Sequence, residues 1–151
     1  GAHSIERDVY PDLAVEGQLS GFPFEGWFVD AGTPLSWIEA MEVCLTRKRW
    51  RHGGGIPDSS WAGDGVSIAE GARIDFSAID DRAIIADATT VSHSSLLEDS
   101  CVGEGAAISS CLVGKRAVIG ARAKLSNVVI DYDSVIPEGH IQDGGVWPLT
   151  D

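Results

Sequence analysis

The sequence predicts a mainly β protein, a triangular parallel β-helix of about five 17-residue coils that follows a small α/β unit. Three observations lead to this fold class. An apolar repeat with a period of 17 residues runs from Ile68 to Trp147, small residues recur inside each repeat, and the residues before it show helical spacing instead. Because glycines at 53–55 separate the two patterns, we place the units at 4–52 and 56–151.

Three columns of apolar residues define the repeat. Members of a column lie 17 residues apart, and 14 of the 15 positions are apolar. The columns are Ile68, Ile85, Val102, Ile119, Ile136; Ile74, Val91, Ile108, Leu125, Gln142; and Ile79, Leu96, Val113, Ile130, Trp147. Three anchors per unit are typical of a coil with three short sides, whose anchors stack on their counterparts at a spacing of ~4.8 Å. Small residues would let the chain turn inward four positions after the first anchor: Ala72, Thr89, Ala106 and Ala123.

The α/β unit is predicted from turn and cap residues. The segment 11–17, "PDLAVEG", begins with proline and ends with glycine, as short helices do. The segment 21–29, "GFPFEGWFV", indicates two extended strands joined by a turn. Thr33 is a suitable N-cap and Pro34 a suitable first residue for a helix over 34–50. Its apolar face is predicted from helical spacing at Leu35, Ile38, Met41 and Leu45.

Composition limits the function classes. The formal net charge of -12 argues against nucleic acid and anionic membranes as partners, and no apolar run approaches the ~18 residues of a membrane span. The three cysteines form no C-x-x-C pair, so we expect free thiols in a reducing compartment and a cytoplasmic location. The run "RKRWRH" at 47–52 either complements a helix C-terminus or binds an anionic regulator.

The repeat also resembles a known motif. "IAEGAR", "VGEGAA" and "IGARAK" are similar to the hexapeptide repeat of left-handed parallel β-helices. This resemblance implies the left hand of the solenoid. The spacing does not show it, and the general preference for right-handed crossovers would argue against it.

Residues 4–40 resemble the end of the catalytic domain in sugar-nucleotide pyrophosphorylases, the NDP-sugar synthases that include mannose-1-phosphate guanylyltransferase. The resemblance rests on the sequence "SIERDVYPDLAVEGQLSGFPFEGWFVDAGTPLSWIEA". The resemblance implies a parent nucleotidyltransferase that makes an NDP-sugar and pyrophosphate from an NTP and a sugar 1-phosphate. GTP and mannose 1-phosphate are the preferred interpretation, and glucose 1-phosphate is the alternative. The family's G-x-G-T-R-[LM]-x-P-L-T loop is absent, so we expect a C-terminal portion that is inactive alone and serves assembly or regulation.

The resemblance assigns one site residue. In the family, the aspartate of W-x-D-x-G-T binds the divalent metal beside the nucleotide phosphates, and this role falls on Asp30 with Mg²⁺ as the cofactor of the full-length enzyme. Mg²⁺ takes oxygen ligands and is commonly shared between one or two carboxylates and phosphates. The alternative role for Asp30 is to help cap the following helix. No other catalytic or cofactor-binding residue is predicted.

Two other functions remain alternatives. A hexapeptide-repeat acyltransferase would need a catalytic histidine near a protruding loop, but His93 and His140 lie in coils without insertions, which favours packed or solvated side chains. A purely structural oligomerisation module would use the open ends and exposed edges of the solenoid. We also expect a homo-oligomer, because residues 5–30 would otherwise leave apolar side chains uncovered.

Overall fold

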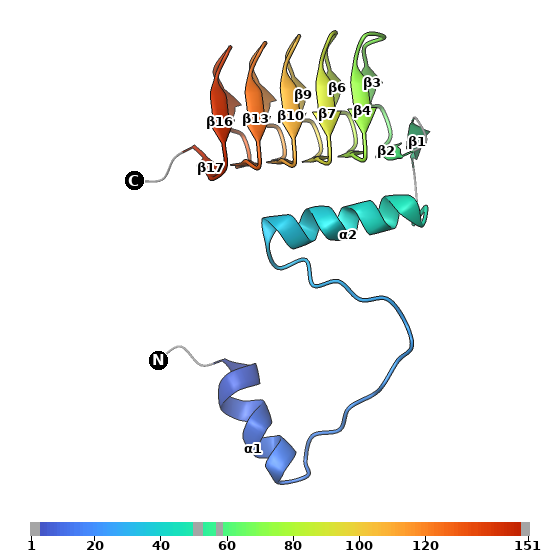
Figure 1. The fold of residues 1–151 in the computed structure, drawn as a ribbon, viewed down its shortest axis with the longest axis vertical. Helices are drawn as coiled ribbons and strands as arrows, with labels where there is room; N and C mark the ends of the chain where they lie inside the picture. Colours follow the sequence, from blue (N-terminus) through green and yellow to red (C-terminus); the bar gives the residue numbers. More distant parts are fainter. Residues whose placement is uncertain (1–3, 50–52, 57–58, 149–151) are drawn as a thin grey trace.

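Stacked coils form a solenoid with three sheets in the computed structural model, which describes residues 4–49, 53–56 and 59–148 (Figure 1). Sheet A consists of β1 (Gly54–Ile56), β2 (Ser60–Ala62), β5 (Ala78–Ile79), β8 (Ser95–Leu96), β11 (Leu112–Val113), β14 (Val129–Ile130) and β17 (Val146–Trp147). Sheet B consists of β3 (Ser67–Ile68), β6 (Ile84–Ile85), β9 (Cys101–Val102), β12 (Val118–Ile119) and β15 (Val135–Ile136). Sheet C consists of β4 (Arg73–Asp75), β7 (Thr90–Ser92), β10 (Ala107–Ser109), β13 (Lys124–Ser126) and β16 (Ile141–Asp143).

The register of the sheets confirms the three apolar columns. Apart from β1, each strand pairs in parallel with the strand 17 residues away, so that Val102 lies between Ile85 and Ile119 in sheet B. These anchors are at most 1% exposed, and the columns of sheets A and C pack into the same core. The predicted fold class, a left-handed parallel β-helix of about five coils, is confirmed as a mainly β solenoid of parallel strands. Its left hand continues to rest on the resemblance.

A ladder of buried polar side chains runs along one inner corner of the solenoid. The hydroxyl of Ser77 accepts a hydrogen bond from the backbone N–H of Ser94 at 3.1 Å, and the hydroxyl of Ser94 accepts one from Cys111 at 3.0 Å. Each hydroxyl also donates to a carbonyl two residues earlier in its own coil. The ladder therefore joins successive coils through backbone groups that would otherwise lie unpaired in the core.

The first coil is covered by an antiparallel strand. β1 pairs with β2, although the sequence predicted only a break at the glycines of 53–55, so the solenoid unit begins before residue 56. Gly53 has φ +71°, and a Cβ there would overlap the carbonyl oxygen of Ala62. The tight approach that pairs β1 with the solenoid edge thus requires glycine at this position.

Helix α2 (Pro34–Thr46) lies along sheet A, beneath the solenoid in Figure 1. The expected N-cap is confirmed, since Thr33 and Ser36 form a reciprocal capping box. The helix ends at Thr46 rather than at residue 50, because the chain turns into a left-handed conformation at Lys48 (φ 52°), and position 50 lies outside the described residues. None of the described helices has the length and hydropathy needed to cross a membrane.

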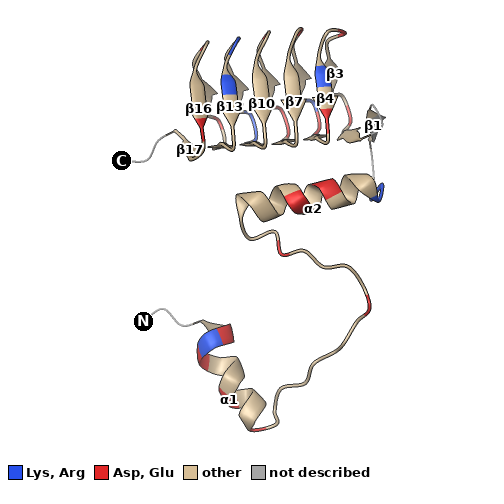
Figure 2. Ribbon diagram, in the orientation of Figure 1, with Lys and Arg blue, Asp and Glu red and all other residues tan. Residues whose placement is uncertain are grey.

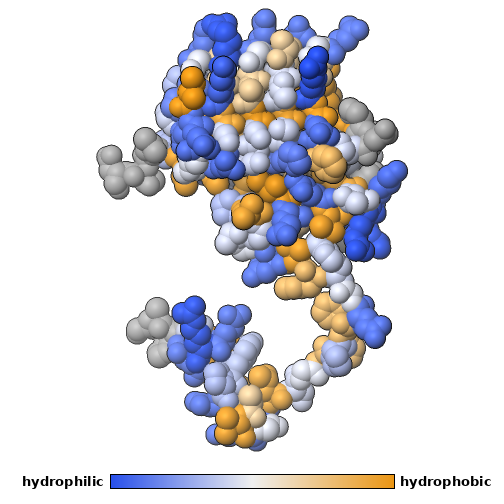
Figure 3. Space-filling view, in the orientation of Figure 1, coloured by the Kyte–Doolittle hydropathy of each residue, from blue (hydrophilic) through white to orange (hydrophobic). Residues whose placement is uncertain are grey.

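The N-terminal segment differs from its prediction. A π-helical turn η1 (Ile5–Val9) and helix α1 (Tyr10–Val15) precede an irregular segment that leads to α2. The short helix is confirmed, but the two strands predicted within 21–29 are wrong for this chain. A strand requires a hydrogen-bonding neighbour, and none of the described strands pairs with these residues. Their aromatic side chains consequently remain exposed, as the isolated chain segment in Figure 3 shows.

Candidate functional site

Asp30 lies in the irregular segment just before α2, and its side chain is exposed. Its carboxylate is turned back over the next glycine, because a Cβ built on Gly32 would lie 3.3 Å from Oδ1. With described residues, Asp30 makes no hydrogen bond or ion pair. Since Thr33 supplies the N-cap of α2, the alternative role of Asp30 as a helix cap finds no contact in its favour.

The described residues do not form a complete metal site. They contain no group of three or more histidine, cysteine, aspartate or glutamate side chains that converge on one point. Asp30 offers one exposed carboxylate beside a glycine, which fits a single ligand to a hard cation whose other ligands are phosphates or water. The fit is therefore that of one contributing residue, and the described part of the chain does not by itself enclose a magnesium ion.

The contact between α2 and sheet A consists of apolar side chains from both elements. Ile38, Met41 and Leu45 form the buried face of the helix, packed on Trp61, Ala78 and Leu112 of the sheet. Leu35, predicted for the same face, is 78% exposed and lines a groove beside the helix. Figure 3 shows the apolar atoms that gather where the helix meets the solenoid.

A groove of about 570 Å³ runs along α2 and has an apolar floor with one polar edge. At that edge His93 Nδ1 lies 2.6 Å from Oε1 of Glu42, which joins the helix to the second coil. The imidazole of His93 also stacks on Phe76, with ring centroids 5.4 Å apart and an interplanar angle of 5°. Acidic residues on α2 and the basic residues that follow it are visible in Figure 2.

Neither His93 nor His140 lies on a protruding loop, as the catalytic histidine of a hexapeptide-repeat acyltransferase would. His93 is held between Phe76 and Glu42, and its side chain is 45% exposed. His140 packs on Trp147 at 4.6 Å between ring centroids and hydrogen-bonds to Gln142 at 3.1 Å. Both are packed side chains within regular coils, which agrees with the structural interpretation and gives the acyltransferase alternative no support.

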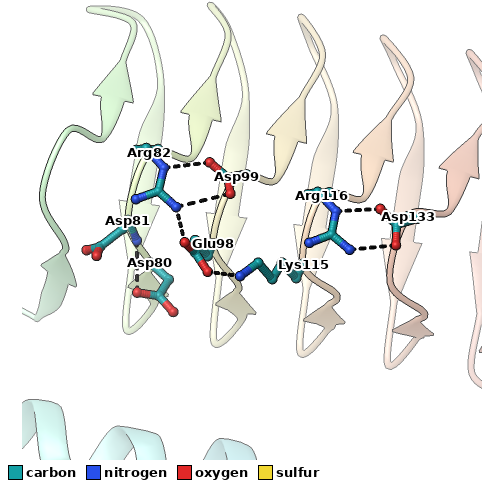
Figure 4. Close-up of polar contacts among 8 residues, drawn as sticks. All are labelled: Asp80, Asp81, Arg82, Glu98, Asp99, Lys115, Arg116 and Asp133. Carbon is teal, nitrogen blue, oxygen red and sulfur yellow. Dashed lines mark hydrogen bonds and ion pairs between the residues drawn. The ribbon is translucent and has the colours of Figure 1, made fainter.

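A ladder of ion pairs follows the corner between sheets A and B (Figure 4). Arg82 donates two hydrogen bonds to Asp99, at 2.7 and 3.1 Å, and Arg116 donates two to Asp133, at 2.6 and 2.7 Å. Glu98 contacts both Arg82 and Lys115 and so extends the first pair to the next coil, whereas Arg116 and Asp133 form a separate pair in Figure 4. The hydrogen bonds from Arg82 hold the pKa of the Asp99 carboxyl below its usual range, and those from Arg116 do the same for the pKa of Asp133.

The basic run at 47–52 is only partly described. Arg47 is the C-cap residue of α2, and its guanidinium lies 5.7 Å from the centre of the Trp27 ring. Residues 50–52 lie outside the described residues. The contact ties the irregular segment to the helix end, while binding of an anionic regulator stays a prediction.

Two of the contacts described above, the Glu42–His93 contact and the ion-pair ladder, were not predicted from the sequence. The Glu42–His93 contact joins residues 51 positions apart, and it depends on how α2 sits on the solenoid. The ion-pair ladder did carry a signal, because Arg82, Asp99, Arg116 and Asp133 alternate in sign at the same period of 17 as the core.

The comparisons with known proteins first give a class. Residues 70–142 match the family described as GlmU-like, C-terminal hexapeptide. This match and the parallel solenoid agree with the resemblance of these residues to the hexapeptide repeat.

A shorter part of the chain is similar to individual curated proteins. The chain is 35% identical over 49 residues to the mannose-1-phosphate guanylyltransferase catalytic subunit beta of Xenopus tropicalis, and equally to the mannose-1-phosphate guanyltransferase beta-A of Xenopus laevis. The match covers 32% of this chain and 14% of each relative. Together with the hexapeptide match, it confirms the resemblance to the C-terminal portion of a sugar-nucleotide pyrophosphorylase and supports a nucleotidyltransferase family.

Proposed function

We propose that this chain is the C-terminal part of an enzyme that makes an NDP-sugar and pyrophosphate from an NTP and a sugar 1-phosphate. The observation that carries the proposal is the joint similarity to a GlmU-like hexapeptide domain and to mannose-1-phosphate guanylyltransferases. The names of these relatives favour GTP and mannose 1-phosphate as the substrates. The free thiols of the described residues suit work in the reducing cytoplasm.

Within that enzyme, Asp30 acts as one oxygen ligand of a magnesium ion. When bound, the ion would offset the phosphate charge while the sugar-phosphate oxygen attacks the α-phosphorus of the NTP and pyrophosphate leaves. The contribution of this chain is to present an exposed carboxylate, unpaired among the described residues, beside Gly32. The Thr33–Ser36 capping box fixes the start of α2 three residues later and so limits where Asp30 can move.

The role proposed for the chain itself is assembly. The packing of Ile38, Met41 and Leu45 on sheet A and the Glu42–His93 contact hold α2 on the solenoid, so the helix links the solenoid to the segment that carries Asp30. The chain contains one contributing ligand and no complete metal site among its described residues. We therefore expect no NDP-sugar formation by the 151-residue chain alone.

The test compares two carboxylates of the same segment in the complete enzyme. Asp30→Asn should lower kcat by at least a hundredfold, whereas Glu25→Gln removes an exposed carboxylate nearby and should leave kcat unchanged. Pyrophosphate release from GTP and mannose 1-phosphate is the readout, with glucose 1-phosphate in parallel. Wild-type turnover by Asp30→Asn would refute the metal role. Absence of turnover with any NTP and sugar 1-phosphate would refute the nucleotidyltransferase itself.

A further inference from the structure

A second groove lies beside α2, separate from the one that the Glu42–His93 contact borders. It has a volume of about 470 Å³, which is within the range of small-molecule sites, and none of the roles described above uses it. Its floor is a part of sheet A that α2 leaves uncovered, with Val129 and Val146. Its walls are Trp37 on the helix and Tyr132 in the turn after β14.

The two aromatic rings of this groove are exposed and unpartnered. Trp37 is 45% exposed and Tyr132 is 60% exposed. Trp27, by contrast, lies against the guanidinium of Arg47, whereas neither ring of the groove has a ring or cation partner among the described residues. The face of an aromatic ring attracts cations, most strongly in Trp. Two such faces in one groove therefore favour a positively charged ligand.

A carboxylate is the only charged group that the described residues place in the lining. Oδ1 of Asp131 accepts a hydrogen bond from the backbone N–H of Tyr132 at 2.7 Å, and Oδ2 has no partner within the described structure. The charged residues of α2 are Glu39 and Glu42, so the helix also adds negative charge. The partial positive charge at the N-terminus of α2 opposes a cation, but its influence is confined to the first turn.

The corner between sheets A and B, which carries Tyr132, is acidic as a whole. Its charged residues at 80–82, 97–99, 114–116 and 131–133 are Asp80, Asp81, Arg82, Glu98, Asp99, Lys115, Arg116, Asp131 and Asp133. Six carboxylates thus surround three cations, and each cation is already paired with a carboxylate of the same corner (Figure 4). The groove therefore lies beside a surface with an excess of negative charge.

From the two unpartnered rings and the acidic surroundings we propose that this groove binds a small organic cation with an apolar body, such as a quaternary ammonium. The ammonium lies between the faces of Trp37 and Tyr132, its methyl groups rest on the apolar floor, and Asp131 supplies the opposing charge. Because one wall belongs to α2 and the other to the solenoid, the ligand joins the two elements and stabilises the docking of the helix. The inference goes beyond the proposed function and holds whether or not the parent enzyme is a nucleotidyltransferase.

Other ligand classes fit the groove less well. An anion would meet the carboxylate of Asp131 and no unpaired cation. A sugar needs several hydrogen-bonding side chains, but besides Asp131 the described lining offers only the hydroxyls of Ser95 and Tyr132, and Ser95 is buried. An uncharged apolar ligand could use the same floor, so the first experiment separates it from a cation.

The first experiment titrates the 151-residue chain with choline and follows its backbone amides in proton–nitrogen correlation spectra. Shifts should centre on Gly114, Val129 and Tyr132, with a dissociation constant on the order of 1 mM for a ligand of this size. The matched ligand is the carbon isostere of choline, in which an uncharged quaternary carbon replaces the nitrogen. Its dissociation constant should be at least tenfold higher, because the rings and the carboxylate attract only the charge.

Three results of this titration would overturn the proposal. Equal affinity for choline and its isostere would show that the groove selects apolar volume and not charge. Saturable shifts centred on Leu35 and Asn127 would place the ligand in the other groove beside α2. Absence of saturable shifts would show that neither groove binds the cation.

The second experiment tests the walls of the groove with matched variants. Trp37→Leu and Tyr132→Leu should each raise the dissociation constant for choline at least fivefold, whereas Phe28→Leu removes a ring that is 74% exposed outside the groove and should leave it unchanged. Asp131→Asn keeps an oxygen that can accept from Tyr132 and should raise the constant at least threefold. Glu104→Gln removes the same charge from the exposed corner between sheets B and C and should not. Equal effects of the two charge variants, or unchanged affinity in both ring variants, would overturn the site.

Discussion

Two neighbouring isoleucines of β6 allow the inward and outward faces of the solenoid to be compared with one substitution. Ile85 is 1% exposed and stacks between Ile68 and Val102, whereas Ile84 is 50% exposed on sheet B. Both side chains lie in the same two-residue strand, so Ile84→Ala and Ile85→Ala share the same backbone environment.

The expected costs follow from burial. Replacing isoleucine by alanine removes three carbon groups worth about 0.8 kcal/mol each when fully buried, so Ile85→Ala loses about 2.4 kcal/mol before the cavity is counted. The cavity raises this to about 3 to 4 kcal/mol, because the stacked coils above and below cannot close around it. Ile84 is half exposed and leaves no enclosed cavity, so its loss should be about 1 kcal/mol.

Urea unfolding followed by circular dichroism, at submicromolar protein, measures the difference without a contribution from association. With a denaturant slope near 2 kcal/mol/M, the midpoint should fall by about 1.5 to 2 M for Ile85→Ala and by about 0.5 M for Ile84→Ala. Equal shifts, or a larger one for Ile84, would contradict the assigned register, because a slip of one residue exchanges the two faces.

Three further predictions concern the core and the ion-pair ladder. Ser94→Ala should lower the free energy of unfolding by about 1 to 3 kcal/mol, because it leaves the buried N–H of Cys111 without its acceptor. Ser100→Ala should cost nothing, since the buried hydroxyl of Ser100 has no partner in the described structure. The midpoints of urea unfolding compare the two variants. Val102→Asp should prevent folding or cost several kcal/mol, seen as loss of the β signal in circular dichroism. The pKa of Asp99 is lowered by its hydrogen bonds from Arg82, so its contribution to stability is present above the unfolded-state pKa and lost as pH falls through the folded one. Asp99→Asn should therefore flatten the fall of Tm in acid, and an unchanged slope would contradict this.

The solenoid could be predicted from the sequence because its packing is periodic. Each inward anchor, such as Val113, contacts counterparts one repeat away, so a column in space is also a column in the sequence. The buried Ser77–Ser94–Cys111 ladder has the same period, but it lies outside a pattern that is defined by apolar residues alone. A period of 17 shows that the side chains of one column point the same way, and this holds for polar residues as well as for apolar ones.

The docking of α2 could not be predicted in the same way. Helical spacing identified Ile38, Met41 and Leu45 as a buried face, but it also included Leu35, which the structure leaves exposed. Spacing defines a stripe on the helix and says nothing about where the covering surface ends. The Glu42–His93 contact depends on that placement, and so it appeared only in three dimensions.

The local pattern of residues 21–29 predicted strands that do not form in this chain, and hydrogen exchange can test whether a missing partner strand is the reason. Between Leu19 and Gly32, no backbone N–H donates a hydrogen bond to another described residue, and Phe28 is 74% exposed. Amides of this segment should therefore exchange at nearly unprotected rates in the 151-residue chain, while those of β9 and β12 exchange far more slowly. If the apolar alternation belongs to a strand of the proposed catalytic domain, the amides of Trp27 to Val29 should gain at least hundredfold protection in the complete enzyme, because a neighbouring strand would accept their hydrogen bonds. Rapid exchange there in both proteins would show that the pattern is no strand, and it would remove the rigid support that a metal ligand at Asp30 requires.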